Sequence, residues 1–208
     1  MEKFTKLEAI AAPIMQINID TDVIIPSREM KHVSKNGLSD GLFANWRYTK
    51  PGGRKLDPDF ILNQKPYTKA KILFSGANFG CGSSREHAVW ALYEWGIRAI
   101  IAPSFGDIFF GNCVRNGILP IVLENQAVLE LANQIKNEEK NRIEIDLNKC
   151  VIRSPSNEYY SFNISASDRK MLLEGMDEIA VTQKRDDQIF AFQEKDILSR
   201  PWAYLEKN

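Results

Sequence analysis

Apolar and polar positions in the middle of the chain follow two alternating patterns. Residues 72–74, 99–102 and 119–123 are short apolar runs, which predict buried strands. Between the first two runs lies a segment with the i, i+3, i+4, i+7 spacing of one buried helix face, at Ala88, Ala91, Leu92 and Trp95. A second helix is predicted over residues 107–115. This order predicts parallel strands joined by helical crossovers.

The N-terminal third lacks helical periodicity and predicts strands and loops. Residues 9–20 are apolar but interrupted by Pro13, and residues 23–26 form a β-branched run that a proline ends. Residues 50–66 carry three turn signals that contain proline, which predict a long irregular surface segment. Loops of this length inside a compact domain are often functional.

The C-terminal part adds helices and a hairpin. Residues 127–136 predict a helix with one apolar face, and residues 165–174 predict a closing helix ended by a glycine. Residues 143–147 and 150–153 predict a hairpin with a two-residue turn. The predicted fold class is α/β: a single domain over residues 1–208, with a mixed sheet of a parallel β-α-β core and added antiparallel strands.

Composition argues against two classes of partner. Lys and Arg number 27 and Asp and Glu number 27, so the net charge is zero and no nucleic-acid partner is expected. No apolar run reaches the length of about 18 residues that a membrane span needs. The N-terminus lacks the apolar core of a secretory signal, and three widely spaced cysteines (Cys81, Cys113 and Cys150) form no CxxC pair. We therefore expect a cytoplasmic protein.

Residues 80–88, Gly-Cys-Gly-Ser-Ser-Arg-Glu-His-Ala, combine several features that favour an anion. Gly80 and Gly82 allow a sharp turn and a close approach to a ligand. If a helix starts near Ser84, its first N–H groups and its dipole face the loop. Arg85 adds a charge and a planar fork that matches a carboxylate. The loop therefore predicts a carboxylate cradle.

A second interpretation of the same residues is purely structural. Ser83 to Glu86 also matches a capping box, in which Ser83 is the N-cap and Glu86 lies at N3. A helix dipole contributes at most about 2 kcal/mol, so it moves the pKa of a serine by about one unit. A catalytic serine would need Arg85, several backbone N–H groups and a closed, dry pocket. His87 is expected one turn along the helix, as a packing residue.

The 80–88 segment resembles the glycine–serine–serine–arginine–glutamate–histidine signature of the aconitase superfamily. Residues 20–26, 42–48 and 101–109 also resemble segments of that superfamily, most closely the family of 3-isopropylmalate dehydratase small subunits. The similarity extends into the final helix and so covers nearly the whole chain. It implies a single swivelling β/β/α domain that closes over a larger partner.

The resemblance also implies an activity. In this family 2-isopropylmalate loses water and is rehydrated to 3-isopropylmalate, a step of leucine biosynthesis. The chain is then a hydro-lyase subunit that binds a small dicarboxylate and is inactive without its large subunit. The resemblance places a [4Fe–4S] cluster on that large subunit and implies no metal or cofactor on this chain. Cys81 is interpreted as a small loop residue rather than a ligand.

Specific roles follow residue by residue from the same resemblance. Ser83 matches the catalytic base, and Ser84 and Arg85 match positions that bind the substrate carboxylate. Asp22 matches an acidic residue near the site, whereas Asp20 is interpreted as a turn aspartate that bonds its own backbone. Substrate selectivity is expected somewhere in residues 27–37.

Two alternatives to this function stay open at the sequence level. The first is the small subunit of a related hydro-lyase that acts on citraconate and methylmalate or on homoaconitate. The second is an anion-binding or partner-binding module without catalytic activity, in which the serines only cap a helix.

Overall fold

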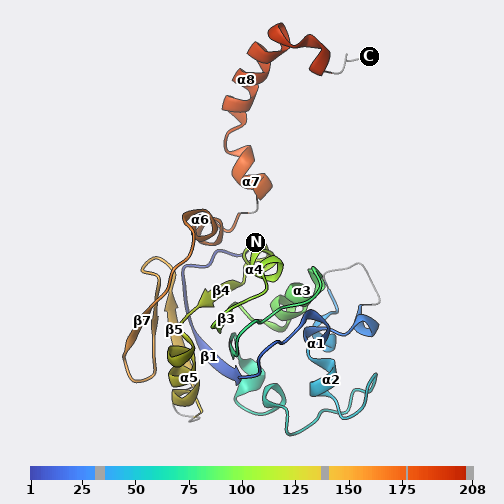
Figure 1. Cartoon of the computed structure of the whole chain (residues 1–208), viewed down its shortest axis with the longest axis vertical. Coiled ribbons are helices and arrows are strands. Elements are labelled where there is room, and N and C mark those ends of the chain that lie inside the picture. The colour runs from blue at the N-terminus through green and yellow to red at the C-terminus, as the bar shows by residue number, and fades with distance from the viewer. Residues whose placement is uncertain (31–35, 137–140, 177, 205–208) are drawn as a thin grey trace.

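The computed structural model describes residues 1–30, 36–136, 141–176 and 178–204. Its strands form one seven-stranded sheet in the order β4-β3-β2-β1-β5-β6-β7 (Figure 1). The strands are β1 (Lys6–Ile14), β2 (Ile72–Ser75), β3 (Ala99–Ala102), β4 (Leu119–Val122), β5 (Arg142–Asp146), β6 (Val151–Arg153) and β7 (Tyr159–Ser161).

Strand β1 joins a parallel half of the sheet to an antiparallel half. Its first residues, 6–10, pair antiparallel with β5, and its last residues, 11–14, pair parallel with β2. Strands β2, β3 and β4 are also parallel, while β5, β6 and β7 are antiparallel. The predicted parallel core with added antiparallel strands is therefore confirmed.

Helices pack around the sheet, and 3-10 turns and a C-terminal extension complete the described structure. The α-helices are α1 (Thr21–Ile24), α2 (Ala44–Arg47), α3 (His87–Trp95), α4 (Asp107–Arg115), α5 (Asn125–Gln134), α6 (Ala166–Glu174), α7 (Glu178–Gln183) and α8 (Asp186–Ser199). The 3-10 turns are Ser27–Glu29, Ser39–Gly41, Ile61–Asn63, Tyr67–Lys69 and Pro201–Ala203.

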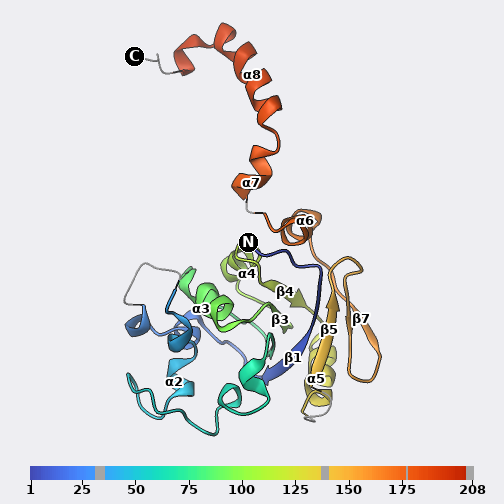
Figure 2. The same ribbon diagram turned by 180° about the vertical axis from the view of Figure 1, so that it is seen from behind.

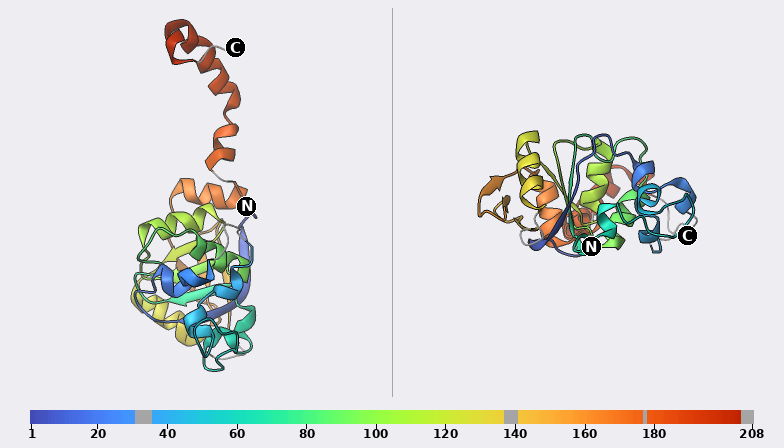
Figure 3. Two further views of the ribbon diagram at one scale, coloured as in Figure 1. Left: turned by 90° about the vertical axis from the view of Figure 1, so that its right-hand side faces the viewer. Right: turned by 90° about the horizontal axis from the view of Figure 1, so that it is seen from below.

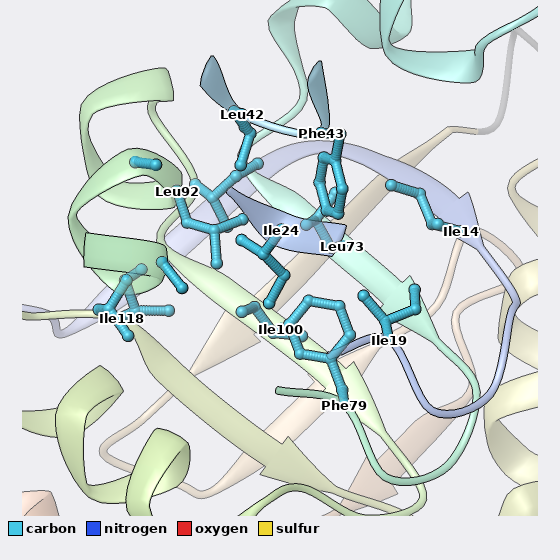
Figure 4. Close-up of a cluster of buried hydrophobic side chains, with 14 of the residues drawn as sticks. Ile14, Ile19, Ile24, Leu42, Phe43, Leu73, Phe79, Leu92, Ile100 and Ile118 are labelled. Atoms are coloured by element: carbon cyan, nitrogen blue, oxygen red, sulfur yellow. The ribbon is translucent and has the colours of Figure 1, made fainter. Parts of the chain in front are cut away.

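The parallel strands are buried on both faces because their side chains alternate between two hydrophobic clusters. Leu73 and Ile100 face a cluster that contains Leu92 of α3, together with residues of α1 and α2 (Figure 4). Their neighbours Ile72 and Ile101 face the other cluster, which includes the apolar sides of α5 and α6. Burial on both faces explains why these strands have continuous apolar sequences.

Two predictions for local structure were wrong, and one strand was missed. The β-branched run at 23–26 is not a strand, because residues 21–24 form helix α1 with the Asp20 side chain as its cap. The β5–β6 turn has four residues, 147–150, rather than two, and Cys150 adopts a φ of 52° in it. Strand β7 was not predicted, since a three-residue edge strand carries almost no periodicity. Residues 50–66 contain no strand and one short 3-10 turn, as expected of a loop.

Helices α7 and α8 project away from the rest of the molecule (Figures 1 and 2). The chain leaves the body after α6, whose Leu172 carbonyl accepts a 2.9 Å bond from the Phe4 N–H, just before β1. The side view shows the same extension beyond the sheet and its helices (Figure 3). No helix among the described residues is both long enough and apolar enough to span a bilayer. The single domain expected for residues 1–208 stays a prediction.

Candidate active site

The loops that follow β1, β2 and β3 meet at the carboxyl edge of the parallel strands. The Gly80 N–H donates to the Ile19 carbonyl over 2.7 Å, which ties the second loop to the first. The Gly106 N–H donates to the Phe79 carbonyl over 2.9 Å, which ties the third loop to the second. This edge is where open α/β sheets place their ligands.

Positions 80 and 82 of the 80–88 segment require glycine for different physical reasons. Gly80 has a φ of 73°, and a Cβ there would lie 2.1 Å from Cγ of Phe109. The sequence suggested that Gly80 lets the backbone approach a ligand. The structure shows instead that the close neighbour of Gly80 is a buried aromatic ring of α4. Gly82 is exposed with a φ of 91°, and an added Cβ would make only ordinary van der Waals contacts, with Asp20 and Thr21. Both positions favour glycine because L side chains rarely adopt these angles.

The helix after this loop begins later than predicted. Helix α3 starts at His87 rather than near Ser84, and Glu86 occupies its N-cap without a side-chain cap bond. The Glu86 carboxylate instead accepts a 2.7 Å hydrogen bond from the Asn116 amide, beyond the end of α4. The capping box from Ser83 to Glu86 is therefore not formed. His87 lies in the first turn, not one turn further, and its ring packs on Trp90 with centroids 4.8 Å apart.

The late helix start leaves both serine side chains on the surface. Ser83 and Ser84 are exposed, and within the described residues neither hydroxyl makes a hydrogen bond. The backbone at this point is nevertheless held, since the buried Thr21 hydroxyl donates to the Ser83 carbonyl over 3.3 Å. Sequence reasoning missed this role of Thr21, and the only signal for it was a threonine between two aspartates.

The structure brings Asp22 and Arg85 together, although 62 residues separate them in the chain. The Arg85 guanidinium forms an ion pair with the Asp22 carboxylate, and their side chains are 34% and 56% exposed. An exposed pair contributes about 0–1 kcal/mol, so an incoming carboxylate can compete for the guanidinium at little cost. Asp20 accepts a 2.7 Å bond from the Val23 N–H, which confirms it as a turn aspartate.

Known proteins resemble this chain along its whole length. Residues 1–126 match the family described as the aconitase C-terminal domain. A 3-isopropylmalate dehydratase small subunit from Cupriavidus necator is 54% identical over 207 residues, which cover 99% of this chain and 100% of that protein. Another, from Neisseria meningitidis serogroup A, is 46% identical over 98% of this chain and 99% of that protein. The chain belongs to the 3-isopropylmalate dehydratase small-subunit family.

A solved structure supports the fold of this small-subunit family member. The crystal structure of 3-isopropylmalate dehydratase from Methanocaldococcus jannaschii has a TM-score of 0.62 and 26% identity. The match covers 92% of this chain and 99% of that chain. The resemblance found in the sequence is thereby confirmed, and so is the aconitase C-terminal domain fold.

The segment expected to set selectivity in this family member is only partly described. Residues 31–35 of the 27–37 range lie outside the described residues, and Ser27–Glu29 forms a 3-10 turn. The far end of the range is held by Glu94, whose carboxylate accepts bonds of 2.6–2.7 Å from the N–H groups of residues 37–39. Burial of Glu94 raises its pKa, but these three bonds outweigh it and the pKa is lowered.

The three cysteines lie in three different places. Cys81 is half-buried beside the site, Cys113 is buried in α4, and Cys150 is in the β5–β6 turn. Burial raises the pKa of the Cys113 thiol well above its usual range, so this thiol stays protonated. Among the residues that the structure describes, no three His, Cys, Asp or Glu side chains are grouped to hold a metal ion.

Proposed function

We propose that this chain is the small subunit of a 3-isopropylmalate dehydratase, a hydro-lyase that converts 2-isopropylmalate to 3-isopropylmalate in leucine biosynthesis. The observation that carries the proposal is the 54% identity to such a subunit across the full length of both chains. The exposed serines and the paired arginine at the carboxyl edge of the sheet support it.

In this proposal Arg85 binds a carboxylate of the substrate. A guanidinium has five N–H donors in a planar fork, which a carboxylate can engage with both oxygens. Asp22 accepts from one terminal nitrogen and so orients the fork before substrate arrives. Ser84, exposed next to Arg85, gives a second hydrogen bond to the same carboxylate group.

Ser83 is the proposed catalytic residue, and it exchanges a proton with the carbon next to the hydroxyl-bearing carbon. A serine on an open surface is far from ionised near neutral pH. The helix dipole does little to change this, because α3 begins four residues after Ser83 and the dipole effect falls off within one turn. The serine needs a second surface that excludes water and surrounds it with donors. The exposed position of Ser83 therefore supports a site completed by another polypeptide.

We assign the iron–sulfur cluster of the reaction to that larger polypeptide. A [4Fe–4S] cluster takes several cysteine ligands from one region of a protein. Cys81, Cys113 and Cys150 come from the site, the core and a remote turn, so the described residues of this chain do not fit such a cluster.

Reconstitution with the large subunit encoded in the same genome tests the proposal. We expect turnover of 2-isopropylmalate only when both subunits are present. Ser83→Ala should lower kcat by a factor of about 10²–10⁴, the usual contribution of a proton-transfer group, without weakening the association of the subunits. The matched control is Ser161→Ala, an exposed serine on β7, which should leave kcat unchanged.

Two results would overturn the proposal. Turnover by this chain alone is one, and full activity of the Ser83→Ala pair is the other. Higher kcat/KM for citraconate or homoaconitate than for 2-isopropylmalate would keep the site chemistry but replace the substrate.

A further inference from the structure

The C-terminal arm, residues 178–204, carries large apolar side chains that the rest of the molecule does not cover. Phe190, Phe192 and Trp202 are 63%, 61% and 79% exposed. Ile179, Ile197 and Leu198 are exposed in the same arm. Large apolar patches on a protein surface mark interaction sites.

These side chains do not form a single stripe along α8. Phe190 and Ile197 are seven residues apart and share one face of the helix. Ile189 and Phe192 lie on a different side, where they line a pocket of about 400 Å³ with Thr182 of α7. A helix that is hydrophobic on all sides is buried in protein, and α8 approaches this in part because its apolar side chains lie on two sides. The arm thus fits a partner that encloses it rather than one flat surface.

The exposed aromatic side chains of the arm supply a substantial part of the area that a stable interface buries. An aromatic side chain buries about 150–250 Å² when covered, so the three exposed aromatics offer roughly 300–500 Å². A standard interface buries about 800 Å² on each partner. The three aromatics alone would therefore supply about half of one side, and aromatic anchors often dominate binding energy.

The arm lies beyond the part of the chain that the aconitase C-terminal domain family matches. The aconitase C-terminal domain family matches residues 1–126 only. The small subunit from Cupriavidus necator aligns over 99% of this chain, and therefore through the arm as well. An element present in separate small subunits, beyond the common domain, is suited to hold the larger polypeptide.

The arm and the candidate active site lie at opposite ends of the strands: the arm near the start of β1, and the site at the carboxyl ends of the parallel strands. The arm follows α6, which bonds to the chain just before β1 begins, whereas the site follows the carboxyl ends of the strands (Figure 1). Nine-residue β1 separates these ends by about 30 Å at roughly 3.3 Å per residue. A partner that contacts both ends must be a protein of considerable size.

We propose that residues 178–204 are a docking arm that the large subunit encloses, so that the arm sets subunit affinity and takes no part in the chemistry. The inference rests on the proposed function and names its interaction surface. Its consequence is a separation of effects: variants of the arm change the dissociation constant, and variants of the 80–88 segment change turnover.

The test uses the full-length chain with two arm side chains changed together, Phe190→Glu and Leu198→Glu. The dissociation constant for the purified large subunit is measured by calorimetry. Activity is then titrated with that subunit to saturation. We expect the dissociation constant to rise at least about 30-fold, as for loss of a binding hot spot. At saturation kcat and the KM for substrate should stay within about twofold of wild type.

Leu129→Glu is the matched control, since Leu129 is an exposed apolar residue on α5 in the body. It should leave the dissociation constant unchanged. Melting temperatures of both variants should equal that of wild type, because the changed side chains are exposed.

Three outcomes would overturn the docking arm. The first is an unchanged dissociation constant in the double variant, and the second is an equal loss in the Leu129→Glu control. The third is a dimer of this chain alone, seen by light scattering, that the double variant dissociates. That result would assign the arm to a second copy. If the wild-type chain binds the large subunit but the pair does not convert 2-isopropylmalate, the proposed function fails. The effect of the arm variants on the dissociation constant can still be measured.

Discussion

Two helix starts in this protein have the same serine-led pattern but different structures. Ser165 is followed three residues later by Asp168, and Ser83 is followed three residues later by Glu86. Before α6 the pattern acts locally, since the Ser165 hydroxyl accepts a 3.1 Å bond from the Asp168 N–H. Before α3 the serine caps nothing, and the helix begins only at His87.

Contacts from distant parts of the chain cause this difference. Glu86 is drawn to Asn116, and Gly80 is bonded to the loop after β1, so the backbone of the 80–86 segment follows the sheet edge instead of the helix. At residues 37–39 the backbone N–H groups are satisfied by a distant side chain instead of a local one, since they donate to the carboxylate of Glu94 on α3. Because these tertiary contacts shift the start of α3, Ser83 does not serve as an N-cap and its hydroxyl is available for chemistry.

The largest expected effect comes from removing the special backbone at Gly80. Gly80→Ala puts a Cβ into the Phe109 ring at an unfavourable φ, and it should destabilise the protein by about 2–5 kcal/mol. Gly52→Ala is the control, because Gly52 has a φ of 72° but open space around its added Cβ. It should cost about 1–2 kcal/mol. Urea unfolding of the two variants checks this, and equal losses would show that Phe109 does not shape the loop.

Arg85→Lys tests whether the fork of the guanidinium matters rather than its charge. Lysine keeps the charge but cannot engage a carboxylate with two parallel bonds. We expect the KM for substrate in the reconstituted enzyme to rise about 10–100-fold, equivalent to about 1.5–3 kcal/mol for charged hydrogen bonds. Arg153→Lys, which changes a half-buried ion pair with Glu144 far from the site, should leave KM unchanged. An unaltered KM in Arg85→Lys would remove Arg85 from the substrate site.

The two serines should also differ in their effect on stability. Ser165→Ala removes a real N-cap and should lower the free energy of unfolding by about 1 kcal/mol. Ser83→Ala removes an exposed hydroxyl without a partner, so its effect should stay below about 0.3 kcal/mol. Chemical denaturation of both variants measures this contrast. An equal loss at both positions would restore the capping interpretation of Ser83.

The smallest effect concerns Glu94 and depends on pH. Its pKa is lowered in the folded protein, so its stabilising contribution is complete above the ordinary value near 4.5 and is lost as the pH falls through the folded value. Glu94→Gln should therefore destabilise the protein near neutral pH, by less than about 1 kcal/mol because the group is exposed. The difference from wild type should shrink below about pH 4.5. Glu194→Gln on α8 is the control, and a difference that grows in acid would contradict the assignment.

Much of the fold follows directly from the sequence. Strands over residues 72–74 and 99–102 and a helix over residues 107–115 were predicted, because buried runs and helical spacing are local signals, and β2, β3 and α4 are found there. The edge strand β7 and helix α1 were missed, since three or four residues show no period. At the site, Ser83, Ser84 and Arg85 were found from one continuous motif, whereas Thr21 acts through a contact across 62 residues.

The sequence by itself therefore determined the longer elements of the parallel core and the family, because periodicity and a nine-residue motif are properties of consecutive residues. Only the tertiary structure decided that Ser83 is exposed, that Asp22 faces Arg85 and that the apolar arm lies outside the body. The physical reason is that these features depend on hydrogen bonds and packing between segments far apart in the chain. The 80–88 segment has the local sequence pattern of a helix N-cap, but hydrogen bonds to Ile19 and Asn116 hold it in a different backbone conformation.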